Sequence, residues 1–333
     1  MSEDDKKQIL KVLSGAIQRE TGAFNFYSKK GEDLALPPGV RGLLTRLAEE
    51  ERRHRRLLLN EYLSVKKGWH EGEKREKGRT LSFSIPEQLT LTPLEVSSGL
   101  DTAAVSLPSR LVGGDNVLSF VLRGPGGEET ITALLLYDVM GHSLETTEIN
   151  GLAARLVGEH GEMSGSSRVE AEQMSPKRLV GLLNRNIYEK YGGQGVFLTM
   201  ICVLFDLEEG VFMYTCAGHE PPFVVLDGGK AASLLNTQLI AGIDPEYSYR
   251  EHEVPFGGGD LLCIFSDGII EAKNGKGEYF GREGVKRILE ENAERSPRDI
   301  IEAVLEGVGR FLGDNQLEDE VSIVVVKSKG EQP

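Results

Sequence analysis

The first part of the chain carries apolar residues at the three- and four-residue spacing of an amphipathic helix. Between residues 6 and 30 these include Ile9, Val12, Leu13, Ala16 and Ile17. Prolines 37 and 38 interrupt the pattern, and a second helical pattern runs from about residue 40 to 65. We therefore predict a helical hairpin over residues 1–65. Two helices bury little apolar surface by themselves, so we expect this hairpin to pack against a partner.

Beyond residue 81 the pattern changes to short apolar runs separated by turns, which is typical of strands. The predicted strands are residues 117–122, 132–139, 197–207, 211–218, 222–226, 260–268 and 321–327. Helical spacing predicts helices at 144–160, 176–191, 284–294 and 297–312. So many strands with so few helices between them favour an α+β fold of layered, largely antiparallel sheets. We assign residues 66–80, which are charged and interrupted by glycine, as a linker and 81–333 as a second domain.

Charge also divides the chain. Residues 1–80 hold 18 Lys+Arg and 13 Asp+Glu, a net charge of +5. The remainder holds 20 basic and 39 acidic residues, a net charge of −19. An acidic domain repels nucleic acid and suits divalent cations, so we expect no nucleic-acid partner.

Composition indicates a cytoplasmic protein without membrane contact. No apolar run reaches the length of a membrane span, and the first residues, MSEDDKKQILK, lack the apolar core of a signal peptide. Cys202, Cys216 and Cys263 lie in apolar runs without CxxC spacing. We interpret them as buried thiols rather than as disulfides or zinc ligands.

Four aspartates flank predicted strands of the second domain. Asp115 precedes one strand, Asp138 and Asp267 end two others, and Asp319 comes just before the last. Carboxylates at strand ends can converge on one rim of a sheet, where they would repel one another unless cations bind them. Two hard divalent cations would turn them into ligands and activate a bound water.

Six segments around these aspartates resemble the metal-dependent serine/threonine phosphatases of the protein phosphatase 2C superfamily, in particular the SpoIIE/RsbU type. In chain order they are SRLVGGD, DVMGH, FLTMICVLFD, YTCAGHEPPFVV, GGGDLLCIFSDGIIEAKNGKGEYFG and DEVSIVVV. The resemblance implies an α/β/β/α phosphatase domain with two Mn²⁺ or Mg²⁺ ions. It implies that Asp115, Asp138, Asp267 and Asp319 bind metal, together with the Val139 backbone carbonyl. It also implies a phosphorylated protein substrate, such as an anti-sigma-factor antagonist.

The chain departs from the pattern of many relatives at three places. It has Leu118 where they carry a second aspartate, Ser143 where they carry glycine, and Asp319-Glu320-Val321-Ser322 where they carry Asp-Asp-x-Thr. The four main ligand positions remain, so we expect an active enzyme.

Several polar residues near these segments also have structural explanations. We interpret Asp260 as a turn residue and favour structural loop roles for His142 and His219, since the family's chemistry needs no imidazole ligand. Arg110 is a weak candidate for a phosphate contact.

The hairpin carries a second candidate metal site. Glu51 and His54 lie three residues apart on one helix, and Glu20 lies on the other. Residues 8–63 resemble the hairpin of ferritin-like, rubrerythrin-type proteins, which use two hairpins per four-helix bundle. Only one hairpin is present, so we expect a homodimer in which two copies of these residues form a di-iron site that senses a signal. The alternative is a solvated, ion-paired helix surface around AEEERRHRR.

Two other functions stay open on the sequence. One is a signalling scaffold whose phosphatase site has lost activity. The other is a ferritin-like di-iron oxidase, which would leave the larger second domain unexplained.

Overall fold

The computed structural model describes residues 3–33, 35–67, 89–107, 114–123, 129–140, 148–149, 151–156, 175–191 and 196–330. Arg110, His142 and Ser143 lie outside these residues, as does the predicted linker beyond residue 67. Of the helix predicted at 144–160, residues 148–149 and 151–156 are described, and these are helical.

The predicted hairpin is present as helices α1 (Glu3–Gly31) and α2 (Pro38–Lys67). The backbone N–H of Val40 donates to the Pro37 carbonyl at 2.9 Å, which closes the first turn of α2. Proline suits the first position of a helix because its missing N–H has no intrahelical partner there. Helix α2 continues two residues beyond the predicted boundary at 65.

Two sheets form the second domain. The strands of the five-stranded sheet, in spatial order, are β1 (Leu100–Leu107), β11 (Val321–Ser328), β10 (Leu261–Phe265), β6 (Phe223–Val225) and β7 (Ala231–Ser233). The strands of the six-stranded sheet are β2 (Asp115–Arg123), β3 (Glu129–Met140), β4 (Phe197–Asp206), β5 (Val211–Ala217), β8 (Thr237–Gln238) and, paired with β5, β9 (His252–Pro255). Among these strands only the short β5–β8 pairing is parallel, so the predicted antiparallel arrangement is confirmed.

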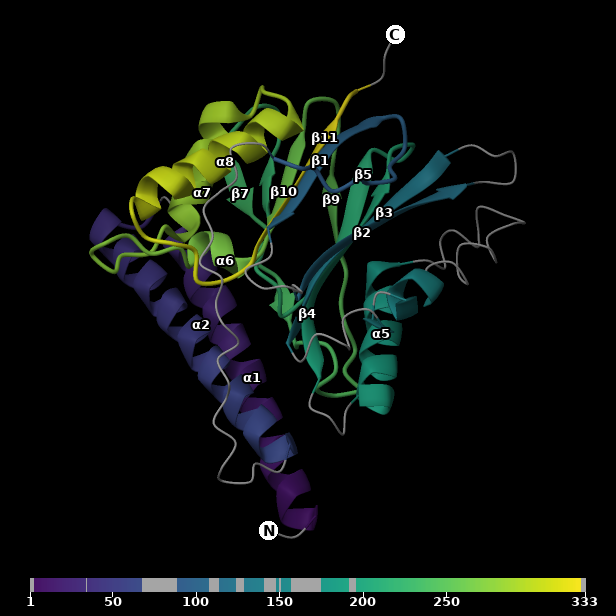
Figure 1. The fold of residues 1–333 in the computed structure, drawn as a ribbon, viewed down its shortest axis with the longest axis vertical. Coiled ribbons are helices and arrows are strands. Elements are labelled where there is room, and N and C mark those ends of the chain that lie inside the picture. Colours follow the sequence, from purple (N-terminus) through teal and green to yellow (C-terminus); the bar gives the residue numbers. More distant parts are fainter. Residues whose placement is uncertain are drawn as a thin grey trace.

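Helices cover both outer faces of the paired sheets (Figure 1). Helices α7 (Gly281–Asn292) and α8 (Pro297–Leu312) pack on the five-stranded sheet, whereas α5 (Pro176–Tyr191) packs on the six-stranded sheet. A four-residue helix, α6 (Asp267–Ile270), follows β10. The layered α/β/β/α fold is therefore confirmed.

The strand β3 shows why its sequence is apolar without alternation. Leu134 and Leu136 face the core between the sheets, and Leu135 and Tyr137 face the core under α5. All four are essentially buried. A strand covered on both faces gains from apolar residues at every position, which produces the run LLLY.

The hairpin packs against the second domain of its own chain. Ile17, Leu59 and Tyr62 bury against Phe197 and Ile240, among other residues. The Tyr62 hydroxyl donates to the Ile243 carbonyl at 3.1 Å, and Asn25 Nδ2 donates to the Thr237 carbonyl at 2.8 Å. The partner expected for the hairpin is thus supplied in part within the chain.

The three cysteines are free and buried, as the sequence indicated. In the described parts of the chain, no helix combines the length and the apolar character that crossing a bilayer requires.

Candidate active site

Asp115 and Asp138 lie opposite each other at one end of the β2–β3 ladder. The N–H of Val139 donates to the Gly114 carbonyl at 3.1 Å, which extends the pairing beyond Asp115. Gly114 lies against both candidate ligands: a Cβ there would stand 2.4 Å from Asp138 Oδ1 and 3.1 Å from the Val139 carbonyl oxygen. Only glycine therefore fits beside the Asp138 carboxylate.

Asp267 and Asp319 are brought together by neighbouring strands of the other sheet. Asp267 begins α6 directly after β10, and Asp319 precedes β11, which pairs with β10. Ser266 joins the two segments: its Oγ accepts from the Ser322 N–H at 2.9 Å. A Cβ at Gly268 would lie 1.9 Å from the Glu320 carbonyl oxygen, so this close approach also requires glycine.

Glu320 connects the two sheets at the site. Its Oε2 accepts hydrogen bonds from the backbone N–H of Gly114 at 2.5 Å and of Asp115 at 2.9 Å. Residues at the start of β2 are thereby fixed to the segment that carries Asp319. Sequence reasoning did not identify Glu320 as functional, although its departure from the Asp-Asp-x-Thr pattern marked the position.

Burial and mutual repulsion make these carboxylates hard to ionise without a cation. Burial, with a smaller contribution from Asp267 and Glu320, raises the pKa of Asp115 to about 7, although the Ser266 and Ser322 hydroxyls lower it. Burial and the charges of the other site carboxylates, Asp115 first, raise the pKa of Asp138 well above its usual value. Burial and the Asp267 charge raise the pKa of Asp319 to about 6. Asp115 is buried and Asp138 half-buried, whereas Asp319 is exposed, so water screens the Asp319 charge more and the first two carboxylates carry the larger electrostatic cost.

The donor set fits hard divalent cations. Every candidate ligand is an oxygen, and buried Asp115 Oδ2 has no hydrogen-bond partner among the described residues. Such an oxygen is costly to bury unless a cation or a donor reaches it. The four aspartates do not form a tight single-ion cluster: in the described part of the chain, only Glu20, Glu51 and His54 place three ligand atoms within 4.8 Å of one another.

Comparison with known proteins agrees with this geometry. Residues 128–329 match the family model for stage II sporulation protein E (SpoIIE), which is more than half of the chain. The chain belongs to the SpoIIE family. The predicted enzyme class, a metal-dependent protein serine/threonine phosphatase, is thereby confirmed.

Individual relatives support the assignment. Phosphoserine phosphatase RsbU of Bacillus subtilis (strain 168) is 25% identical over 250 residues, which cover 75% of this chain and 69% of RsbU. The PP2C phosphatase domain of Bacillus subtilis SpoIIE, solved with a fragment of its regulatory domain, has a TM-score of 0.57 at 19% identity and covers 89% of this chain and 94% of its own. The SiaA-PP2C domain of Pseudomonas aeruginosa has a TM-score of 0.56 at 18% identity, covering 68% and 85%. The two structures show the shared fold.

The hairpin of this SpoIIE-family chain has a separate match. Residues 11–104 match the rubrerythrin family model, which confirms the predicted resemblance. The match extends past α2 into β1, whereas the sequence pattern supported residues 8–63.

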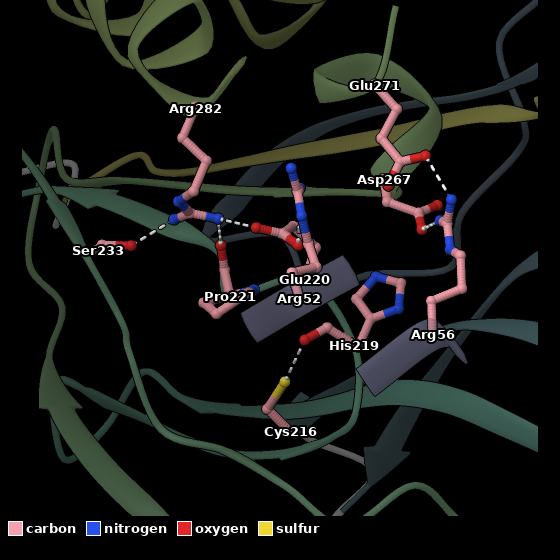
Figure 2. A network of polar contacts seen from close by, with 10 residues as sticks. All are labelled: Arg52, Arg56, Cys216, His219, Glu220, Pro221, Ser233, Asp267, Glu271 and Arg282. Carbon is pink, nitrogen blue, oxygen red and sulfur yellow. Dashed lines mark hydrogen bonds and ion pairs between the residues drawn. The ribbon is translucent and has the colours of Figure 1, made fainter. Parts of the chain in front are cut away.

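Helix α2 also reaches the phosphatase site, which the sequence did not indicate. Arg56 Nη2 donates to Asp267 Oδ2 at 2.7 Å, and Arg56 Nη1 donates to Glu271 Oε2 at 2.7 Å (Figure 2). Burial would lower the pKa of Arg56, but the charges of Asp267 and Glu271 raise it overall. A positively charged side chain of the hairpin, Arg56, therefore contacts the candidate metal ligand Asp267 directly.

A buried ion-pair network lies beside this contact (Figure 2). Glu220 accepts from Arg282 Nη1 at 2.5 Å and lies 3.8 Å from an Arg52 Nη atom. Burial would raise the pKa of Glu220, but the Arg282 and Arg52 charges lower it overall. Glu220 thus stays ionised and joins α2 to the phosphatase domain.

His219 is buried, and Asp260 accepts hydrogen bonds within a turn. His219 is 3% exposed, its Nδ1 lies 3.2 Å from Thr199 Oγ1, and burial lowers its pKa to about 4. Asp260 accepts from the N–H of Asp227 at 2.8 Å and of Gly257 at 2.7 Å, which holds a turn. The Asp260 contacts are those of the turn residue expected from the sequence, whereas the buried Nε2 of His219 has no hydrogen-bond partner among the described residues.

The structure brings Glu20, Glu51 and His54 together on the hairpin. His54 Nδ1 lies 3.3 Å from Glu51 Oε2 and 3.7 Å from Glu20 Oε2. A hydrogen bond with Glu51 is the largest cause that raises the pKa of Glu20. The His54 side chain is 56% exposed, so the cluster is open at the surface.

Proposed function

We propose that this chain hydrolyses phosphoserine or phosphothreonine on a partner protein, with two Mn²⁺ or Mg²⁺ ions held by Asp115, Asp138, Asp267, Asp319 and the Val139 carbonyl. The observation that carries the proposal is the buried Asp115 Oδ2, which lacks a hydrogen-bond partner among the described residues and belongs to the residue opposite Asp138. A hard cation would satisfy that oxygen and relieve the repulsion between the two carboxylates.

The bound cations would supply an activated water and offset charge on the phosphoryl oxygens. The chain itself holds the ligands in place. The β2–β3 ladder fixes Asp115 and Asp138, and the contact between Ser266 and Ser322 fixes the segments that carry Asp267 and Asp319.

A cysteine nucleophile does not fit this site. Cys202, Cys216 and Cys263 are buried, and burial raises the pKa of each thiol. A protonated, inaccessible thiol is a poor nucleophile. The mechanism that we propose instead is direct attack of a water on phosphorus, which needs no covalent nucleophile.

The substrate we propose is a phosphorylated regulatory protein of the anti-sigma-factor antagonist kind, as the resemblance of the sequence implies. The similarity to phosphoserine phosphatase RsbU supports a phosphorylated side chain on a protein. A cytoplasmic location belongs to the same proposal, and the three free thiols support it.

The test is phosphate release from a phosphoserine peptide and from p-nitrophenyl phosphate by the full chain. We expect activity with Mn²⁺ or Mg²⁺ and its loss in EDTA. Activity that persists after metal analysis shows the protein to be metal-free would overturn the proposed mechanism. No release from either substrate with any divalent cation would favour the inactive scaffold instead.

We also propose that the hairpin forms a homodimer and that two copies of Glu20, Glu51 and His54 make a di-iron site. Six large apolar side chains of α1 and α2 stay exposed after the hairpin has packed on its own chain: Ile9, Val12, Phe26, Val40, Leu43 and Leu57. A second hairpin would cover them in a four-helix bundle. One chain supplies three ligand groups, whereas a di-iron site of this type needs two sets.

Iron content of anaerobically purified protein tests the hairpin site. We expect iron in the parent and its loss in Glu51→Ala and His54→Ala, while Mn²⁺-dependent phosphatase activity persists in both variants. Equal iron in the parent and the variants would remove the site.

A further inference from the structure

Three arginines of α2 face the phosphatase domain within a little more than one helical turn. Arg52 lies near Glu220, Arg55 is 8% exposed, and Arg56 contacts Asp267 and Glu271. Figure 2 shows the side chains of Arg52 and Arg56 extending from α2 into the network around His219 and Glu220. Of these arginines, Arg56 contacts an aspartate that the proposed function assigns to metal binding.

The contact is strong for its degree of exposure. Both nitrogens at the end of the guanidinium are used, each on a different carboxylate at 2.7 Å. Charge-assisted hydrogen bonds of this length are about twice as strong as neutral ones. The Arg56 and Asp267 side chains remain 44% and 41% exposed, so solvent ions can reach the pair.

A divalent cation and the Arg56 guanidinium are both positively charged, and both would bind the Asp267 carboxylate. Cation binding to Asp267 would put two positive charges in direct contact with one carboxylate, and at that short distance solvent screens their repulsion only in part. Without the cation, Arg56 offsets part of the repulsion among the site carboxylates. The cation therefore favours the site without Arg56 on Asp267, and Arg56 favours the site without the cation.

We propose that Arg56 competes with the catalytic divalent cation for Asp267, so that the docked hairpin holds the phosphatase site in a metal-poor state. The inference rests on the proposed function in one respect, which is that Asp267 is a metal ligand. By linkage, the free energy by which the docked hairpin weakens cation binding equals the free energy by which a bound cation weakens the docking of Arg56 on Asp267.

Other contacts hold α2 against the phosphatase domain when Arg56 releases Asp267. Leu59 and Tyr62 pack into the apolar cluster with Phe197, and Glu220 pairs with Arg52. Release of Asp267 therefore needs a local shift of α2 rather than separation of the domains. Glu51 and His54 lie on this same segment of α2, so a change in their ligation would act on the position of Arg56.

The test is Mn²⁺ titration of the full chain by calorimetry. In this titration the parent is the full chain with Glu51→Ala and His54→Ala, so that the hairpin cluster of Glu20, Glu51 and His54 does not contribute Mn²⁺ binding. Arg56→Met removes the guanidinium and keeps a long stem, Arg56→Lys keeps the charge, and Arg53→Ala removes an equal charge three residues away on an exposed position of the same helix. Adding Asp138→Asn to the parent identifies which heat belongs to the phosphatase site.

We expect Arg56→Met to bind Mn²⁺ at least about fivefold more tightly than the parent, the lower end of ordinary coupling between two sites. Arg56→Lys should lie between the two, and Arg53→Ala should match the parent. Hydrogen exchange of amides near Arg56 should accelerate on addition of Mn²⁺ in the parent but not in Arg56→Met.

Three results would contradict the inference. Equal affinity in the parent and Arg56→Met, with binding lost in Asp138→Asn, would overturn the competition and leave the metal site standing. Weaker Mn²⁺ binding in Arg56→Met would show that Arg56 supports the site. No Mn²⁺ binding in the parent or in any Arg56 variant would overturn the proposed metal site together with the inference.

Discussion

Asp115 and Asp138 are direct partners in the antiparallel ladder of β2 and β3, where Asp115 is buried and Asp138 half-buried. Opposed like charges in a sheet destabilise it, so this pairing costs stability unless a cation lies between the carboxylates. The preformed set of oxygen ligands therefore makes the metal-free fold less stable. Changes at the site should affect both phosphatase activity and stability.

Asp138→Asn should lower metal-dependent phosphatase activity by roughly a hundredfold or more, since several kcal/mol of charge stabilisation depend on the bound cations. In EDTA, at a pH high enough to ionise Asp138 in the folded state, the same variant should unfold at a higher temperature than the parent, because a carboxylate that repels its neighbours has been removed. Asp101→Asn, at an exposed position of β1, is the control and should change neither. Full activity in Asp138→Asn would remove this residue from the site.

Asp115 and Asp319 should stabilise the metal-free protein at low pH, and this contribution should be lost as pH rises from about 4 to about 7. The pKa values of Asp115 and Asp319 are raised to about 7 and about 6 in the folded state. The unfolded state therefore loses these protons first, and stability present at low pH is lost as pH passes through the folded values. Thermal unfolding in EDTA across this range is the measurement. Mn²⁺ should flatten the profile and release protons on binding, and an identical profile with and without Mn²⁺ would contradict the linkage.

Glu320→Ala should weaken Mn²⁺ binding by roughly tenfold to a hundredfold, as expected for a residue that orients metal ligands. The carboxylate accepts from the N–H groups of Gly114 and Asp115, so its loss frees the start of β2. Glu320→Gln keeps one acceptor and should recover part of the affinity. A purely structural role would instead lower the unfolding temperature and leave Mn²⁺ affinity unchanged.

Gly268→Ala should destabilise the protein by about 1–3 kcal/mol, the usual cost of inserting a methyl group into a packed site. The new Cβ would overlap the Glu320 carbonyl oxygen and push apart the segments that carry Asp267 and Asp319. Chemical denaturation gives the free energy of unfolding. Gly275→Ala is matched, because a Cβ there meets nothing within 4 Å, and it should stay close to the parent.

Phe26→Glu or Leu57→Glu should convert a dimer of the full chain into a monomer. Both side chains are more than half exposed on the hairpin and would lie in an apolar interface between two copies. Analytical ultracentrifugation measures the change. Gln8→Glu, also at an exposed position of α1, adds the same charge without removing apolar surface and should leave the dimer intact. A parent that stays monomeric at all concentrations would reject the bundle and the shared iron site.

Local pattern predicted most of the elements. The helices at 176–191 and 297–312 coincide with α5 and α8, because amphipathic spacing over many residues is a strong and local signal. Strands β1, β7, β8 and β9 were not predicted. β1 contains small and polar residues, and the other three have four residues or fewer, so the pairing with neighbours defines them more than their composition does.

The sequence by itself determined that four aspartates lie next to buried strands, because the apolar runs beside them predict burial. These are Asp115, Asp138, Asp267 and Asp319. Only the tertiary structure decided that Asp115 faces Asp138, that Glu320 holds the start of β2, and that Arg56 lies on Asp267. These contacts join residues that are distant in the chain, 211 positions apart in the case of Arg56 and Asp267. Sheet register and the packing of the hairpin set them, and neither leaves a periodic signal in the sequence.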